Sequence, residues 1–537
     1  MNSVNLSQAI GTSPGAYGNL SDAPPFAAIA PRSVAAFPVE TTKGRRGVAK
    51  VSSREDFIAE YGHNPTFSLT TYGPLFFLQE SNRVVVSRVL HNAKEAGAML
   101  CVVPHETDTP EGMGGMTVLR PFIVGSESGA SGIRMSDDYV LAFYDRSPGH
   151  SEKRIRLVPE INNPDGGFHV EVYVGNSNNY SERHHVKLTD YQNGFGEQMH
   201  IEQVINTRSR NIGVVLNTAV QGTIYLGDNL IDRTMEVWLN GGDGGDRVNA
   251  KDVTDTMIRD FADPERIRFN TIATPGFEVP TVQRVQVAIA QARKGSFACL
   301  GVPFAEQGVE AARAYRNQKL NVDSSYGALY TGDPVVVDPY TKRYTRVPVA
   351  ALAVALYAYT DYAHHPHFSP AGRNRGDMQR FNTISLAEGR FYDQAARDLL
   401  FASQVNPVKT LDELGSFLWG DATLQRRQSL TGMVGVCRHR AALYNTIMDL
   451  VDFKIFDPYD NVLRDSIDSA CKDVLKKDEK LGALSAISTR FDTARNTARA
   501  QDAGDLYYKV SYTPRGSMRR LIIDFTLNNS GLDVTVA

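Results

Sequence analysis

Three histidines lie close together in the segment YAHHPHFSP, and they are the first candidates for a metal site. Zinc needs ligands that converge tetrahedrally at about 2.0–2.1 Å, usually with a further ligand spaced along the chain. His364 and His365 are adjacent and tend to point apart, and Pro366 stiffens the link to His367. We therefore interpret the segment as a polar loop or an interface, with a metal site as the alternative.

A second candidate is the glycine-rich loop GGDGGDRV at 241–248, which matches one nonapeptide of the calcium-binding β-roll type. That architecture needs stacked copies to complete each ion site, and the sequence contains one copy. We interpret the loop as a turn that leads into a helix predicted for DVTDTMIRDF, with calcium binding as the alternative.

Catalytic signatures are weak. The segment GTSPG at 11–15 has the spelling G-x-S-x-G, but a nucleophile elbow needs a preceding strand and a following helix. This segment lies instead in a stretch rich in Ser, Asn, Gly and Pro. The sequence contains no GxxxxGK[ST], no HExxH and no nucleotide fingerprint after a strand. The residues therefore predict neither a cofactor nor an enzymatic activity.

The composition sets the general class of the protein. The chain has 537 residues, of which 42% are hydrophobic and 22% charged, and its formal net charge is −3. Such a chain predicts roughly three or four globular domains. The near-zero charge argues against nucleic-acid binding through a bulk basic field. We expect no membrane span and no export signal, because no long apolar run occurs.

The cysteines predict no disulfide framework, which indicates synthesis in a reducing compartment. They are far apart in the sequence and form no CxxC pair: Cys101, Cys299, Cys437 and Cys471.

The elements that must position any site begin after about thirty arm-like residues. SVAAFPVE reads as a strand, and VSSREDFIAEYG as a short helix capped by Ser52 or Ser53 and ended by Gly62. A second short helix, YGPLFFLQES, leads into the strand RVVVSRVL. From about Asn92 to Asp232, short alternating runs separated by Gly, Ser and Asn predict an inserted, mostly β domain.

Strands and helices then alternate again. IRFNTIATPG and FACLGVPF read as strands on either side of a helix in TVQRVQVAIAQARKG, which predicts a βαβ unit and a parallel or mixed sheet. Lys294 and Gly295 are the stop signals of this helix. Its predicted buried face contains Val282, Val285, Ile289 and Ala292. Later helices are predicted at Asp393–Phe401, Leu424–Val451 and Val462–Leu475.

Both chain ends carry strand-like alternation. RRLIIDFTLN suits a strand with one buried face, and after the turn-forming NNSG the residues Leu532, Val534 and Val536 alternate with polar ones. Val4 and Leu6 give a shorter alternation near the start. Such terminal strands are too short to be stable alone, so we expect them to join a sheet edge, which indicates strand donation between subunits.

A mixed charge pattern marks the end of one predicted helix, CKDVLKKDEK. Acidic residues separate the basic ones, which is typical of a solvated helix face; a docking surface for an acidic partner is the alternative. The basic residues are Lys472, Lys476, Lys477 and Lys480.

In their order along the chain, several segments resemble the contractile tail sheath proteins of bacteriophages and related injection machines. The first half contributes SPGAY, SVAAF, KGRRG, VSSREDFIAEYG, YGPLFFLQESNRVVVSRV, DYQNGFGEQMHIEQVIN, WLNGGDGG and NTIATPG. The second half contributes SSYGALYTGDPVVVDPYTKRYTRVPVAALAVALYAYTD, SPAG, QVNPVKT, FLWGDATL and IFDPYDNVLRDSI. The stretch before SPAG departs from the family pattern by being rich in histidine.

The resemblance implies an α/β and α+β multidomain protein: a mixed-sheet sheath core, an inserted mostly β domain facing outward, and strand-forming terminal arms. It implies a non-enzymatic subunit that stacks as hexameric rings around a tail tube and contracts on a baseplate signal. The implied divisions are an N-terminal arm (1–30), a core (31–94 and 233–365), an insertion (95–232), a C-terminal domain (366–528) and a linker strand (529–537).

In this family the terminal arms join a sheet in neighbouring subunits, and the C-terminal domain carries the tube contact. The resemblance therefore assigns strand exchange to the alternating residues at the two termini and places the tube contact at the four lysines. The implied partners are further copies of the chain, a tail tube protein, a baseplate and tail terminator or neck proteins, without direct nucleic-acid contact or membrane insertion. The implied location is the virion tail, after synthesis in the host bacterial cytoplasm.

Two other classes compete with this interpretation. One is a metal-dependent hydrolase or a calcium-binding adhesin built on the histidine segment or the glycine loop. The other is a tail tube or fibre protein, although tube proteins are usually far shorter and fibres usually contain repeats.

Overall fold

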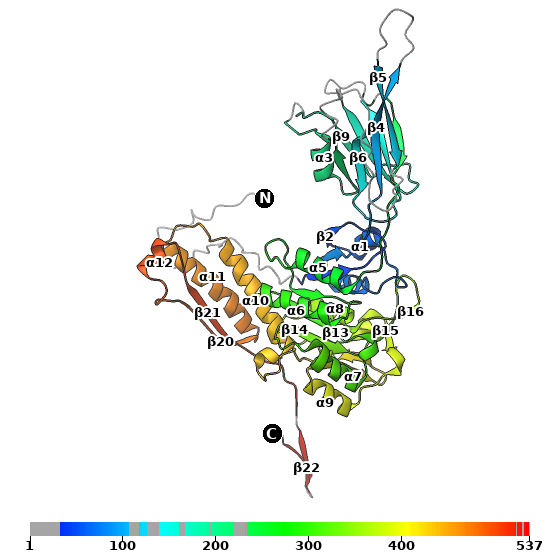
Figure 1. Cartoon of the computed structure of the whole chain (residues 1–537). Helices are drawn as coiled ribbons and strands as arrows, with labels where there is room; N and C mark the ends of the chain where they lie inside the picture. The colour runs from blue at the N-terminus through cyan, green and yellow to red at the C-terminus, as the bar shows by residue number, and fades with distance from the viewer. Residues whose placement is uncertain are drawn as a thin grey trace, which may run out of the picture.

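The computed structural model describes residues 33–106, 117–125, 139–160, 167–192, 196–217, 231, 233–521, 523–528 and 531–535. Figure 1 shows a central α/β core, a β-rich unit standing away from it, a helical lobe on another side and a terminal hairpin that projects from the body. The mixed α/β fold class predicted from the sequence is confirmed. Among the described helices, none is long and apolar enough to cross a membrane.

An eight-stranded mixed sheet forms the core, with the strand order β19-β18-β14-β13-β12-β1-β3-β2. The six inner strands run parallel, and the two edge strands are antiparallel to their neighbours. The strands are β1 (Ala35–Val39), β2 (Gly47–Val51), β3 (Val84–Arg88), β12 (Thr271–Ala273), β13 (Phe297–Gly301), β14 (Gly327–Thr331), β18 (Val405–Leu411) and β19 (Gly415–Leu418).

Helices cover this sheet because parallel strands are buried on both faces. The central helix α8 (Val349–Ala363) is apolar nearly all round and almost wholly buried, and it packs against α2 (Tyr72–Glu80). The other core helices are α1 (Arg54–Tyr61), α5 (Ala250–Phe261), α6 (Pro280–Arg293), α7 (Val309–Ala314), the π-helical turn Tyr315–Leu320 and α9 (Gln394–Ala402). A small sheet contains β15 (Pro334–Val337), β16 (Tyr344–Arg346) and β17 (Thr383–Leu386).

Local signals placed several of these elements correctly. The side chain of Ser53 accepts a hydrogen bond from the Asp56 amide at the start of α1, and Gly62 ends that helix at a φ of 73°. The predicted βαβ unit is β12-α6-β13. The sequence analysis missed β2, which follows the turn-rich KGRRG and pairs antiparallel with β3.

The buried face of α6 differs from the predicted one. Ala292 is exposed, and Val285 is only partly buried. The wholly buried Gln286 takes their place, donating to the carbonyls of Ile272 (2.7 Å) and Cys299 (2.9 Å) and accepting from the Thr274 hydroxyl. Gln286 lies on the buried face because its side-chain amide hydrogen-bonds to two neighbouring strands. A pattern of apolar residues does not reveal such a polar contact.

The β-rich unit has its own hydrophobic core, which runs in sequence from Ala96 to Leu239. Two four-stranded antiparallel sheets enclose it, in the orders β10-β6-β4-β5 and β11-β7-β8-β9. Its elements are β4 (Gly97–Glu106), β5 (Thr117–Gly125), β6 (Tyr139–Asp145), β7 (Lys153–Pro159), β8 (Phe168–Val174), β9 (Glu182–Val186), α3 (Ile201–Arg208), β10 (Ile212–Leu216) and β11 (Met235–Trp238).

The C-terminal lobe has a separate small core around Leu443, Leu475 and Leu484. It consists of α10 (Val434–Asp452), α11 (Asn461–Lys480), β20 (Leu484–Phe491), α12 (Ala498–Asp502) and β21 (Tyr508–Pro514). The predicted helix start at Leu424 is wrong: Ala422 and Met433 form a bridge, and α10 begins after it.

The division predicted at residue 366 also differs from the structure. Strands β18 and β19 follow that residue, yet they complete the edge of the core sheet. The second core begins within α10: Val434 and Cys437 belong to the large core, whereas Leu443 belongs to the lobe. One helix therefore joins the two bodies.

We predict that Gln286→Ala destabilises the core by about 2–4 kcal/mol, because it leaves two buried carbonyls without their side-chain donor. Urea unfolding followed by circular dichroism measures the loss. Gln291→Ala, at an exposed position of the same helix, is the control and stays within about 0.5 kcal/mol of the parent. Equal effects of the two substitutions contradict the role given to the Gln286 amide.

Candidate assembly surfaces

The chain end leaves the lobe as an extended segment and finishes in a hairpin. β22 (Asp524–Asn528) pairs antiparallel with β23 (Gly531–Thr535), in a register that joins Phe525 to Val534 and Leu527 to Leu532. The two strands predicted at the C-terminal end are therefore present, although the first covers only Asp524–Asn528 of the predicted RRLIIDFTLN. Among the described residues, the last strand pairs with β22 and does not join a larger sheet of its own chain.

Within the described residues, this hairpin is a two-stranded sheet with no third strand on either edge. Figure 1 shows it projecting beyond the core. A lone two-stranded hairpin is marginally stable in water and presents unpaired N–H and C=O groups. Of the predicted exchange residues, Leu532 and Val534 lie in β23, whereas Val4, Leu6 and Val536 lie outside the described residues.

An arginine holds the segment before the hairpin onto the core. The Arg519 guanidinium donates to the carbonyls of Asp421 (2.7 Å) and Gly432 (3.0 Å) and lies 5.2 Å from the centroid of the Phe401 ring. After this anchor, Leu521 and Ile523 are exposed, although both are apolar. The segment that leads into the hairpin is thus anchored at a defined point, and two of its apolar residues are exposed.

A second two-stranded sheet lies in the lobe. β20 and β21 pair antiparallel, and among the described residues neither has another strand beside it. Ile487, Val510 and Tyr512 pack on the lobe core, whereas Lys509 and Ser511 point outward and are exposed. This sheet therefore has one buried face, one open face and two open edges.

The four predicted lysines lie on the last turns of α11. Lys476, Lys477 and Lys480 are exposed. The Lys472 ammonium lies 2.6 Å from the Asp468 carboxylate, and its hydrogen bond to that carboxylate holds the pKa of Asp468 below its usual value. Asp468 also accepts from Thr489 and Tyr508, which ties the sheet to the helix. Lys472 is thus engaged within its own chain.

Sequence reasoning missed an apolar tip at the far end of the lobe, defined here as Phe453, Ile455 and Phe456. These residues connect α10 to α11 and are 80%, 56% and 101% exposed. Phe456 also has a φ of 75°, which is unusual for a bulky residue. Exposed apolar residues that gather at one place are typical of an interaction site, and their closeness in FKIF (453–456), between two predicted helices, was the available signal.

The histidine segment follows α8, and only part of it forms a cluster. The Nδ1 atoms of His365 and His367 lie 2.9 Å apart, whereas the exposed His364 packs beside Tyr359 and Phe368. Burial lowers the pKa of His365, and burial together with neighbouring positive charge lowers the pKa of His367 to about 4. Both imidazoles are therefore neutral at pH 7.

The glycine loop at 241–248 lets two stretches of backbone pack closely against each other. A Cβ on Gly242 would lie 2.0 Å from the Gly149 carbonyl oxygen, so the chain approaches too closely for a side chain. Beyond the loop, Asn249 caps α5 in a capping box with Asp252. This is the turn into a helix that we predicted as the favoured interpretation.

No family model matches the chain. Over 224 residues, the chain is 29% identical to the tail sheath protein of Enterobacteria phage T4, a match covering 42% of this chain and 33% of that protein. Over 214 residues, it is 27% identical to the tail sheath protein of Vibrio phage KVP40. That match covers 40% of this chain and 31% of that protein. The chain is a relative of phage tail sheath proteins.

This relationship confirms the resemblance seen in the sequence. The match spans about a third of the length of these tail sheath proteins. Among solved structures, the sheath tail protein of Listeria innocua aligns with 90% of this sheath relative and 95% of that chain, at a TM-score of 0.49 and 12% identity. The sheath tail protein of Desulfitobacterium hafniense aligns over 93% of this chain and 100% of its own, at a TM-score of 0.48 and 12% identity.

We predict that Arg519→Ala releases the segment that precedes the hairpin. The substitution removes two charge-assisted hydrogen bonds that hold this segment on the core, each worth up to about 3 kcal/mol. Chymotrypsin cleavage after Leu521 should accelerate about tenfold, as followed by mass spectrometry. Arg520→Ala, at the neighbouring exposed position, is the matched control and should cleave at the parent rate. Equal cleavage rates in the two variants contradict the anchor.

Proposed function

We propose that this chain is the structural subunit of a contractile phage tail sheath. Subunits polymerise as stacked hexameric rings around the tail tube, and contraction drives the tube through the host envelope. The observation that carries the proposal is the open terminal hairpin, found on a chain related to tail sheath proteins. A hairpin with two unpaired edges is built to complete a sheet in another molecule.

The exchange we propose joins the terminal arms to the lobe sheet of a neighbouring subunit. The donors are Val4 and Leu6 at one end and Leu532, Val534 and Val536 at the other. The acceptor is the β20–β21 sheet, whose edges are open.

A donated strand of about five residues adds about five backbone hydrogen bonds at roughly 0.5–1.5 kcal/mol net each, less the entropy of ordering the arm. One such link is modest. Repetition around a ring and along a tube makes the assembly strong through multivalency.

Contraction in this proposal draws its energy from two packings of the same rigid bodies. The sequence has no nucleotide-binding fingerprint, so the energy is stored in the assembled lattice when it forms. Arms linked through backbone hydrogen bonds keep neighbours connected while their cores re-dock. The segment between the Arg519 anchor and the hairpin supplies the slack that this movement needs.

We place the C-terminal lobe toward the tube and the β-rich unit toward the outside. Lys472, Lys476, Lys477 and Lys480 form the tube contact, and the apolar tip packs against an adjacent subunit. The baseplate and the tail terminator or neck proteins are the partners at the two ends of the sheath. The protein then belongs to the virion tail and is assembled in the host bacterial cytoplasm.

We predict that the purified full-length chain forms six-fold rings or hollow striated tubes in negative-stain electron microscopy. Deletion of residues 529–537 should leave a folded monomer, because it removes β23 and leaves β22 unpaired. Circular dichroism and sizing chromatography verify the fold and the monomeric state.

A point variant separates strand pairing from loss of length. Val534→Pro removes a backbone donor and should block assembly, whereas Val534→Thr keeps a β-branched side chain and should assemble. Long tubes formed by the truncated chain exclude the proposed arm exchange.

We predict that reversing the exposed charges of α11 with Lys476→Glu, Lys477→Glu and Lys480→Glu together lowers cosedimentation with a cognate tail tube protein about tenfold or more. Self-assembly of the variant should remain, because these residues lie away from the hairpin. Lys50→Glu, Lys294→Glu and Lys342→Glu together are the control, because they reverse the same number of exposed charges on the core, outside the proposed tube contact. Undiminished tube binding by the triple variant refutes the assignment of the tube contact.

A further inference from the structure

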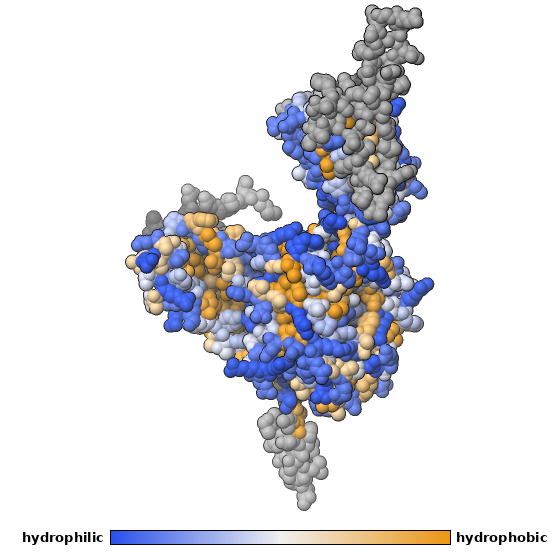
Figure 2. Space-filling model, in the orientation of Figure 1, coloured by the Kyte–Doolittle hydropathy of each residue, from blue (hydrophilic) through white to orange (hydrophobic). Residues whose placement is uncertain are grey.

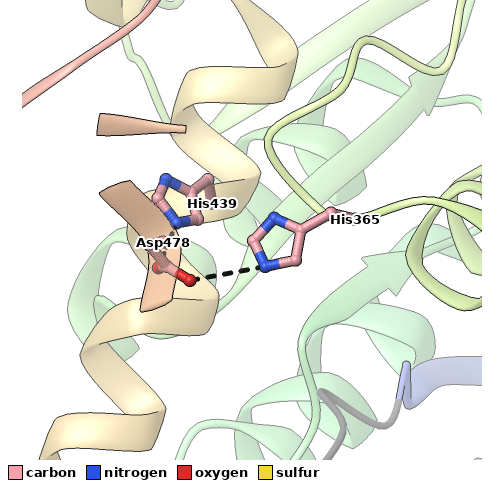
Figure 3. A group of neighbouring side chains, drawn as sticks. All are labelled: His365, His439 and Asp478. Atoms are coloured by element: carbon pink, nitrogen blue, oxygen red, sulfur yellow. Dashed lines mark hydrogen bonds and ion pairs between the residues drawn. The ribbon is translucent and has the colours of Figure 1, made fainter. Parts of the chain in front are cut away.

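Three side chains from distant parts of the chain converge where the core meets the lobe. His365 follows α8, His439 lies on α10 and Asp478 lies on α11, and Figure 3 shows both imidazoles pointing toward the carboxylate. Each residue offers one potential ligand atom, and these atoms all lie within 4.8 Å of one another. Within the described part of the chain, this is the only such group of three or more potential metal ligands.

The separations suit a small tetrahedral ion. His365 Nε2 lies 3.6 Å from one oxygen of Asp478, and His439 Nε2 lies 2.7 Å from the other. Ligands bound to zinc at about 2.0–2.1 Å are roughly 3.3 Å apart in a tetrahedron, so the ion replaces the His439–Asp478 hydrogen bond and moves these two groups apart by about 0.6 Å. Two imidazoles and one carboxylate favour zinc over magnesium or calcium, which prefer oxygen ligands alone.

A second histidine sets the orientation of the first. If the Nε2 atom of His365 faces the ion, its Nδ1 atom carries the proton and donates to His367 Nδ1, 2.9 Å away. Metal-binding histidines usually have such a partner for the second ring nitrogen, which fixes the tautomer and the ring direction. His367 thus supports the site without being a ligand.

The surroundings indicate a structural ion. The side chains of His439 and Asp478 are 2% and 11% exposed, and that of His365 is 16% exposed. The charged neighbours are Lys477 beside His365 and Arg375 beside His367. Three protein ligands leave one coordination position for water, as in catalytic zinc sites, so the structural role rests on the burial of the cluster and on its place between two bodies of the fold.

We propose that His365, His439 and Asp478 bind one zinc ion that fastens the C-terminal lobe to the core. The histidine loop already lies against the start of α10, where a Cβ on Gly435 would be 2.5 Å from the His367 carbonyl oxygen. The ion adds a link from that loop to α11, which belongs to the lobe. The site forms within a single subunit, so it does not depend on the proposed assembly.

The test uses the full-length chain, purified without a histidine tag from zinc-supplemented medium. Elemental analysis should find about one zinc ion per chain after dialysis. Removal with EDTA should lower the Tm, and zinc alone should restore it, because the ion binds the folded state. Titration calorimetry of the stripped protein with zinc gives the Kd.

Variants distinguish this cluster from the histidine-rich segment as a whole. His365→Ala and Asp478→Asn should abolish stoichiometric binding, and His367→Ala should weaken the Kd about 10- to 100-fold. His364→Ala is the matched control: it changes the adjacent, exposed histidine and should bind zinc as the parent does. Circular dichroism checks that each variant is folded.

Cobalt provides a second readout that does not depend on stability. Cobalt-loaded parent protein should show the absorption of a four-coordinate site, and folded His365→Ala should lack it. The proposal is overturned if the parent retains well under one zinc ion per chain and its Tm does not respond to zinc or EDTA. It is equally overturned if His364→Ala loses as much zinc as His365→Ala.

Discussion

Backbone hydrogen bonding at strand edges is the constraint on which the rest of this structure depends. The core sheet ends in β2 and β19, two short antiparallel strands, so its long parallel centre is never at an edge. The lobe sheet and the terminal hairpin each consist of two strands and stay open among the described residues. Strand edges need backbone hydrogen-bond partners. The core sheet meets this need within one chain, whereas the lobe sheet and the hairpin have open edges that favour pairing with another chain.

α10 carries the mechanical connection between these parts. Its first turns are buried in the large core, where Arg438 donates to the Tyr357 carbonyl and forms an ion pair with Asp361. Its later turns pack on α11 in the lobe. A rigid helix shared by two hydrophobic cores transmits displacement of one body to the other, whereas a flexible linker would absorb it. This coupling suits the proposed sheath subunit, in which the lobe moves with the core.

Local signals in the sequence were enough for elements whose ends have caps, such as α1 between Ser53 and Gly62. They were enough as well for the class of the fold, because alternating strands and helices imply a mixed sheet. They failed where a distant polar partner decides the packing: Gln286 turned the buried face of α6 toward carbonyls on two strands. The same limit applies to His365, whose neighbours His439 and Asp478 come from helices that no spacing rule connects to it.

The β-rich unit is joined to the core through a narrow double crossing. Lys94 pairs with Asp243 and Gly97 with Asn240, each through two backbone hydrogen bonds, so the chain leaves and returns at one place. The base of the unit also serves the core: the buried Arg88 of β3 donates to the Pro148 carbonyl (2.7 Å), and the Gly44 amide donates to the Ser147 hydroxyl (2.8 Å). Beyond this base, evolution can exchange, shorten or enlarge the module without rerouting the core, and an engineer could replace it with a foreign domain to display cargo on the proposed assembly.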